Sequence, residues 1–138
     1  MIIVDTNVLS ELMRALAAPA VLDWLSAQAA ASLYTTAISE AEILYGLAVL
    51  PAGKRRKGLE AAAVGLFDDF EGRILPFDSA AAHEWAQITA VRHRSGRPIS
   101  FADAQIAAIA RSHGARVATR DGAGFAGCGV ELIDPWQE

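Results

Sequence analysis

The first seven residues, Met1-Ile-Ile-Val-Asp-Thr-Asn7, indicate the fold more directly than any other stretch of the chain. Ile2–Val4 is a short, wholly apolar run, which is typical of a strand buried on both faces of a parallel sheet. Asp5 follows this run directly, and apolar residues at helical spacing begin at Val8. The opening of the chain therefore predicts a buried strand, a carboxylate at its carboxyl end, and then a helix.

The same alternation of short apolar runs and helical segments continues along the chain. Strands are expected at Ile2–Val4, Leu33–Thr35, Ile74–Leu75, Arg116–Thr119 and Val130–Ile133. Helices are expected over Val8–Leu16, from Pro19, from an N-cap at Ser39 to Pro51, from Leu59 to Phe70, over Ser79–Ser95, and from Ser100 to His113. Strands separated by helices favour the α/β class, as a three-layer α/β/α sandwich with a short-stranded, mainly parallel sheet.

Composition narrows the class of protein. The chain has 138 residues, of which 53% are hydrophobic and 20% charged, so we expect one domain, residues 1–138, with a sizeable core. A single cysteine, Cys128, excludes a disulfide framework and a cysteine-based zinc site. The net charge of −4 excludes a polycation that binds nucleic acid or lipid by bulk charge alone. No segment has the length of a signal peptide or membrane span, so we expect a soluble, cytoplasmic protein.

Four acidic residues are expected near the carboxyl edge of the sheet, where open parallel sheets bind ligands. Asp5 ends the first strand, Glu42 is expected in the first turn of the helix after the second strand, Asp103 in the first turn of its helix, and Asp121 follows the fourth strand. Converging carboxylates repel one another unless a cation such as Mg²⁺ or Mn²⁺ compensates them. Such an ion activates water and neutralises a phosphate transition state, so the pattern indicates metal-dependent phosphodiester hydrolysis.

Three of these acids also have a purely structural explanation. Glu42 completes a capping box with Ser39, Asp103 suits the positive end of its helix, and Asp121 suits a turn before Gly122. Spacing alone leaves both explanations open.

Four segments, in order along the chain, resemble the motifs of PIN-domain ribonucleases of the VapC toxin type, particularly the FitB-like branch. They are Met1–Leu12, Tyr34–Gly46, Pro98–Ala108 and Ala118–Asp121, and each contains one of the four acids. The resemblance implies a PIN fold and an endoribonuclease that depends on Mg²⁺ or Mn²⁺.

The resemblance also implies roles for individual residues. Asp5 and Asp103 are expected to bind the metal directly, and Glu42 and Asp121 to hold it through water or to orient the attacking water. Hydrogen bonds from further polar residues are expected to orient these ligands, and the candidates are Thr6, Asn7 and Thr119. The chain departs from the family at Gly124, where relatives often carry Asp, and at Asp121, where many carry Asn.

Basic and apolar residues suggest the partners. An RNA backbone that approaches several carboxylates needs local positive charge, and the candidates are Lys54, Arg55, Arg56, Lys57, Arg92, Arg94 and Arg97. An apolar stripe belongs either to the core or to a partner surface, and it comprises Leu9, Leu12, Leu16, Leu22 and Leu25 with Tyr45 and Leu47. The resemblance implies a VapB- or FitA-like antitoxin in such a groove, a toxin homodimer, and DNA bound only through the antitoxin.

Three other functions are compatible with parts of this pattern. One is a PIN nuclease of RNA processing that has no antitoxin, and another is a non-catalytic binding subunit, which Gly124 would favour. A phosphatase with Asp5 as nucleophile is disfavoured, because Asn7 stands where such a motif needs a second aspartate. The three tryptophans are interpreted as packing residues, and Trp136 also as an anchor of the C-terminal tail or of an interface.

Overall fold

A five-stranded sheet, parallel throughout, forms the centre of the computed structural model, which describes residues 1–138. The strand order is β3-β2-β1-β4-β5, so the N-terminal strand is central. The strands are β1 (Ile2–Val4), β2 (Leu33–Thr36), β3 (Ile74–Leu75), β4 (Arg116–Ala118) and β5 (Leu132–Ile133). All five predicted strands are therefore confirmed, with ends shifted by at most two residues.

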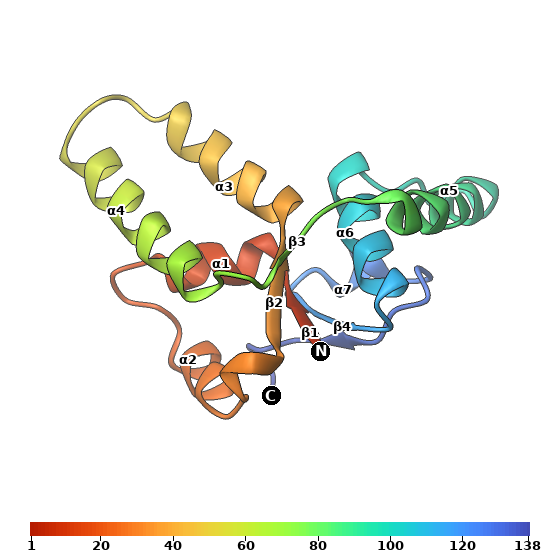
Figure 1. The fold of residues 1–138 in the computed structure, drawn as a ribbon, viewed down its shortest axis with the longest axis horizontal. Coiled ribbons are helices and arrows are strands. Elements are labelled where there is room, and N and C mark those ends of the chain that lie inside the picture. Colours follow the sequence, from red (N-terminus) through yellow and green to blue (C-terminus); the bar gives the residue numbers. More distant parts are fainter.

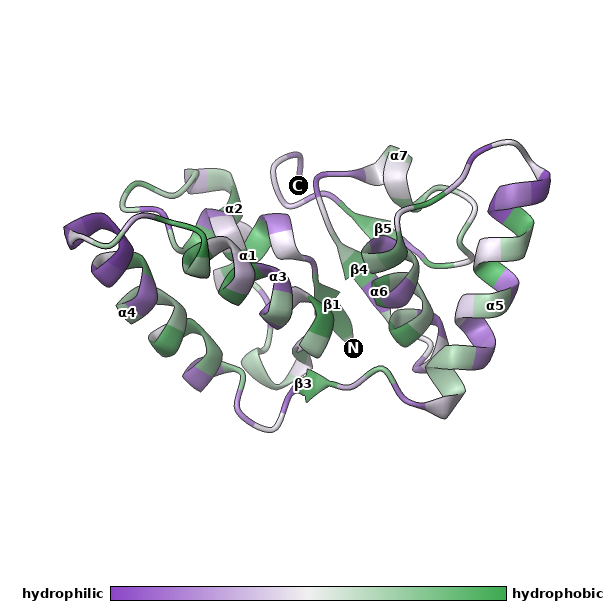
Figure 2. Cartoon of the chain, turned by 90° about the horizontal axis from the view of Figure 1, so that it is seen from above, coloured by the Kyte–Doolittle hydropathy of each residue, from purple (hydrophilic) through white to green (hydrophobic).

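Helices cover both faces of the sheet, which confirms the three-layer α/β/α prediction (Figures 1 and 2). One face carries α1 (Thr6–Leu12), α2 (Pro19–Ser26), α3 (Ala37–Ala48) and α4 (Lys54–Asp69), and a short 3₁₀ turn (Ala30–Ser32) precedes β2. The other face carries α5 (Ser79–Arg94), α6 (Phe101–Ser112) and α7 (Gly122–Phe125). None of these helices is long and apolar enough to cross a membrane.

Alternation along the strands divides the interior into two cores. In β1, Ile2 and Val4 pack with α1–α4, whereas Ile3 packs with α5 and α6 on the opposite face. In β4, Ala118 and Val117 divide in the same way. This period of two is the geometry of a strand. It explains why the opening run has no polar position.

Two predicted helix starts are wrong. Ser39 is not an N-cap, because α3 begins at Ala37 and its cap is Thr36, whose side chain accepts a hydrogen bond from the Ser39 N–H at 3.1 Å. The basic run Lys54–Lys57 forms the first turn of α4 and does not precede the helix. In Figure 1 this turn lies at the outer end of the α3–α4 hairpin, away from the sheet.

The predicted apolar stripe divides between core and surface. Leu9 and Leu47 are buried, and Leu12 and Leu25 pack partly against the same core. The exposed members are Leu16, which lies beyond the end of α1, together with Leu22 and Tyr45.

Candidate active site

The four predicted acids line one cavity of about 550 Å³ at the carboxyl edge of the sheet. They come from separate parts of the chain: Asp5 follows β1, Glu42 lies on α3, Asp103 on α6, and Asp121 follows β4. The lining of this acidic pocket is almost wholly polar, and it comprises Asp5, Thr6, Asn7, Ser10, Glu11, Arg14, Glu42, Asp103, Arg120, Asp121 and Trp136.

Asp5 lies deepest among these acids and is held from two sides. Its Oδ1 accepts a hydrogen bond from the Thr6 N–H at 2.8 Å, and its Oδ2 accepts one from the Thr119 hydroxyl at 2.8 Å. The pKa of Asp5 is raised to about 6, mainly by burial; the two donors lower it, and the nearby charges of Asp103 and Glu42 add to the effect of burial. A cation placed beside Asp5 would remove this penalty on the ionised form.

Thr119 connects Asp5 to two neighbouring segments. While its hydroxyl donates to Asp5, the same oxygen accepts hydrogen bonds from the Asn7 amide at 3.1 Å and from the Asp121 N–H at 3.0 Å. Because Thr119 is buried, water cannot replace these partners. The predicted orienting residues Asn7 and Thr119 thus lie in direct contact with Asp5 or with each other.

Glu42 belongs to the second turn of α3, and it is exposed at the pocket wall. Its Oε1 accepts a hydrogen bond from the Thr6 hydroxyl at 2.8 Å, and the same hydroxyl lies 2.9 Å from that of Ser39. Since Thr36 caps the helix, the capping-box explanation of Glu42 is wrong. The carboxylate is free of a structural role at the helix start.

Asp103 and Asp121 face the same part of the cavity from two helix starts. Ser100 caps α6, where its hydroxyl oxygen accepts a hydrogen bond from the Asp103 N–H at 3.1 Å. Burial raises the pKa of Asp103, and the charge of Asp121 raises it further, whereas the Ser100 hydrogen bond and the charge of Arg92 lower it. Asp121 itself caps α7, where it accepts from the Gly124 N–H at 3.0 Å.

Gly124 permits this position of Asp121. A Cβ atom at residue 124 would lie 2.3 Å from Oδ2 of Asp121, so a larger residue there requires a different Asp121 conformation. The glycine that replaces the family's acid is therefore in direct contact with the carboxylate that the chain retains.

These side chains suit a hydrated magnesium ion better than a closed protein cage. No three His, Cys, Asp or Glu side chains form a ready-made metal cluster. Mg²⁺ needs only one or two carboxylates and keeps several waters. Asp5 and Asp103, two acids whose pKa values are raised by burial, have the chemistry that fits such an ion.

The predicted basic residues do not line the pocket. Lys54, Arg55 and Arg56 border a separate cavity at the start of α4, where Arg56 pairs with Glu60 at 2.8 Å. Of the other predicted residues, Lys57, Arg94 and Arg97 are exposed, and none of them contributes to the pocket.

The prediction that Arg92 binds RNA is wrong. It is buried, and its guanidinium donates to the carbonyls of Arg97, Gly124 and Ala126. It therefore cannot meet a substrate and instead ties the end of α5 to the segment that follows Asp121.

Sequence reasoning missed five residues of the pocket: Ser10, Glu11, Arg14, Arg120 and Trp136. The available signal was spacing, because Asn7, Glu11 and Arg14 lie at i, i+4 and i+7, on one face of α1 and the turn that follows it. Trp136 was predicted only as a packing residue and a tail anchor, and it does pack against the α1–α4 core.

A family model described as PIN domain matches residues 2–126, and the chain therefore belongs to the PIN-domain family. It is 45% identical over 138 residues to VapC ribonuclease Y4jK of Sinorhizobium fredii, covering 99% of both chains. It is 39% identical to toxin FitB of Neisseria gonorrhoeae, over the full length of both. The structure of FitAB bound to an IR36 DNA fragment superposes with a TM-score of 0.91 at 39% identity, covering 99% of this chain and 96% of that one. Within the family, the chain thus lies in the branch of VapC and FitB.

Proposed function

We propose that this chain is the toxin of a type II toxin–antitoxin pair and an endoribonuclease that depends on Mg²⁺ or Mn²⁺. The observation that carries the proposal is the convergence of four carboxylates, from four separate parts of the chain, on one cavity. The proposal extends to this chain what the names of its relatives say of them, that one is a ribonuclease and another a toxin.

In the proposed reaction, Asp5 and Asp103 would hold the metal, and RNA would enter the acidic pocket with its scissile phosphate toward them. The ion, when bound, would neutralise phosphate charge and make a bound water more acidic. Glu42 and Asp121 border the same cavity and orient the attacking water through their carboxylate oxygens. Thr6 and Thr119 fix two of these carboxylates by hydrogen bonds of 2.8 Å, so the acids are in place before substrate arrives.

A cognate antitoxin is the proposed protein partner, and its site is an apolar groove between α3 and α4. We call this cavity of about 410 Å³ the α3–α4 groove, and its apolar lining is Leu44, Leu47, Ala48, Ala63, Val64 and Phe67. A smaller cavity lies between the groove and the acidic pocket. Leu47 lines both the groove and this smaller cavity, and Glu42 lines both the smaller cavity and the acidic pocket. An amphipathic segment in the groove would therefore reach the pocket and block it. A toxin homodimer, with DNA bound only through the antitoxin, completes the proposed assembly.

Cleavage of a mixed RNA panel by the purified protein, with Mg²⁺, with Mn²⁺ and with EDTA, tests the proposed activity. We expect cutting only with a metal, and a loss of at least about 100-fold in Asp5→Asn and in Asp103→Asn. Asp23→Asn, an exposed acid on α2, is the matched control and should cut like the wild type. A folded, antitoxin-free wild type that cuts no RNA would contradict the proposal and favour a binding subunit.

The antitoxin is tested separately. Co-expression with the product of a small neighbouring gene should give a stable complex that no longer cuts RNA. Active protein without such a partner would favour a nuclease of RNA processing.

A further inference from the structure

Two arginines and one tryptophan stand among the acids of the pocket lining, and the proposed reaction has not used them. They are Arg14, Arg120 and Trp136, and Trp136 is the only hydrophobic residue of that lining. No hydrogen bond or ion pair joins either arginine to Asp5, Glu42, Asp103 or Asp121. Arg120 forms no ion pair, whereas Arg14 pairs with Glu11, a further acid of the same lining, at 3.1 Å.

The side chains of Arg120 and Trp136 form a cation–π pair, and the backbone N–H of each residue is held by a hydrogen bond. The guanidinium carbon of Arg120 lies 4.7 Å from the centre of the Trp136 ring. The Arg120 N–H donates to the Asn7 side chain at 3.3 Å, and the Trp136 N–H donates to Asp134 at 2.9 Å. Trp136 is partly buried against the α1–α4 core, whereas Arg120 is exposed. One face of the guanidinium thus rests on the ring, and the side chain is open to the solvent of the pocket.

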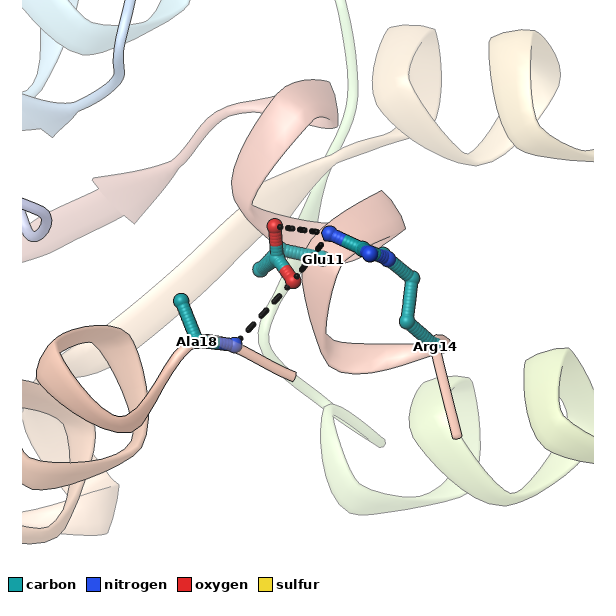
Figure 3. Close-up of polar contacts among 3 residues, drawn as sticks. All are labelled: Glu11, Arg14 and Ala18. Carbon is teal, nitrogen blue, oxygen red and sulfur yellow. Dashed lines mark hydrogen bonds and ion pairs between the residues drawn. The ribbon is translucent and has the colours of Figure 1, made fainter. Parts of the chain in front are cut away.

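Arg14 is held in place by a buried carboxylate (Figure 3). Glu11 is only 6% exposed, and both of its carboxylate oxygens accept hydrogen bonds of 3.1 Å from Arg14. Glu11 also accepts from the Ala18 N–H at 3.2 Å, which anchors it at the start of α2. The side chain of Arg14 remains 66% exposed. Arg14 lies in the turn that follows α1, at the opposite end of this helix from Asp5 and Asn7.

We propose that these residues form a binding site for single-stranded RNA beside the catalytic acids. A base next to the scissile phosphate stacks on the Arg120 guanidinium, which Trp136 supports from beneath, and Arg14 contacts a backbone phosphate farther along the strand. Planar guanidinium and aromatic groups are the surfaces on which unpaired bases stack. The inference rests on the proposed function, since it assigns the substrate contacts of that site.

The lining favours RNA over the antitoxin as the occupant. It offers one aromatic ring among charged and polar side chains, whereas the α3–α4 groove offers six apolar residues to an amphipathic segment. With a net charge of −4, the chain attracts RNA only through local cations, and these two arginines are the basic residues that line the acidic pocket.

Equilibrium binding of a fluorescent single-stranded RNA, in the Asp103→Asn background so that cleavage does not interfere, tests the inference. We expect Arg120→Ala to raise Kd about 10-fold, the typical cost of one lost stacking contact. Arg120→Lys keeps the charge but loses the plane, and it should recover less than half of that loss. Arg14→Ala should reduce the salt dependence of binding by about one phosphate contact.

Arg116→Ala is the matched control, because it removes the same charge from the opposite edge of the sheet, where Arg116 pairs in register with Ile2. It should bind RNA within about 2-fold of the parent. Trp136→Phe, which keeps a smaller stacking surface, should lie between the parent and Arg120→Ala. Its melting temperature must be measured too, since Trp136 also packs against the core.

These measurements distinguish a failure of the proposed RNA-binding site from a failure of the proposed nuclease function. If wild type cuts RNA while Arg120→Ala and Arg120→Lys both bind like the parent, the inference is wrong and the nuclease stands. If Arg120→Ala weakens antitoxin binding and leaves RNA binding unchanged, the site belongs to the antitoxin and the inference is again wrong. A wild type that neither binds nor cuts RNA removes the proposed function itself.

Discussion

The acidic pocket and the α3–α4 groove are neighbours, yet they are built in different ways. The pocket takes its acids from residues as far apart as Asp5 and Asp121, and hydrogen bonds through buried Thr119 fix their positions. The groove takes its lining from one helical hairpin, and Leu44 and Val64 lie on it largely exposed. A pocket that fixes charged groups in advance suits chemistry, whereas uncovered apolar side chains suit a partner.

Thr119 offers the strongest way to damage the pocket without touching the groove. We expect Thr119→Val to lower cleavage about 100-fold, because Asp5 loses a donor while Asn7 and the Asp121 N–H lose their acceptor. The lost buried hydrogen bonds should also lower the free energy of unfolding by about 2 kcal/mol. RNA cleavage and denaturant unfolding measure the two effects.

Thr119→Ser is the matched control for this change. It keeps the hydroxyl and removes only a methyl group, so cleavage should stay within about 3-fold of wild type. Equal losses in the valine and serine variants would mean that packing, and not the hydroxyl, matters at this position.

Glu42 lies where the acidic pocket borders the cavity beside the α3–α4 groove, and its substitution should affect only the pocket. Glu42→Gln should lower cleavage about 10- to 100-fold, since it removes a charge from the pocket, while leaving stability unchanged because the side chain is exposed. Glu40→Gln, two residues earlier and outside the pocket lining, should cut RNA normally. Comparable activity in the two variants would remove Glu42 from the proposed mechanism.

Asp5, Asp103 and Asp121 could be predicted from the sequence because each adjoins a strand or a helix start that the sequence also predicts. Asp5 follows an unbroken apolar run, and Asp103 follows Ser100 by a capping interval. The capping-box explanation of Glu42 failed because the Thr36 hydroxyl accepts the hydrogen bond of the Ser39 N–H, which the Glu42 side chain would accept in a capping box.

The rest of the pocket depends on contacts between distant segments, which local patterns do not encode. Arg120 meets Trp136 only because the C-terminal tail returns beneath the end of β4. Arg92 stands in a run of basic residues that suggests surface charge, but it is buried against the carbonyls of Arg97, after α5, and of Gly124 and Ala126, at the end of α7. In each case at least one partner is distant in the sequence.

Leu44 tests the groove alone. Leu44→Asp places a charge on a lining residue that is 52% exposed, so it should weaken antitoxin binding about 10-fold or more and leave cleavage by free toxin within about 2-fold. Ala61→Asp, an exposed position on α4 outside the groove, adds the same charge and should change neither. Isothermal titration with the antitoxin gives the affinities. An antitoxin that binds Leu44→Asp normally would place its contact elsewhere.

Without a bound metal, the buried carboxylate of Asp5 lowers the free energy of unfolding at neutral and higher pH. Its pKa of about 6 lies above the ordinary value of 3.8, so the folded protein binds a proton that the unfolded chain has already released between these pH values. Stability from this group is therefore complete below about pH 4 and is lost as the pH rises through about 6. In EDTA, Asp5→Asn mimics the neutral carboxyl and should unfold at a higher temperature than wild type at pH 8, with a smaller advantage at pH 5.

The expected gain is small, about 3 °C, corresponding to about 1 kcal/mol for a chain of this size. The substituted side-chain amide limits this gain. When its oxygen accepts a hydrogen bond from the Thr6 N–H, its NH₂ group faces the Thr119 hydroxyl, which already accepts hydrogen bonds from Asn7 and from the Asp121 N–H. Added Mg²⁺ should reverse the order at pH 8, because the ion stabilises only the ionised wild-type carboxylate. If wild type and Asp5→Asn melt together at pH 8 with and without Mg²⁺, burial places no penalty on Asp5 and the ion does not bind there.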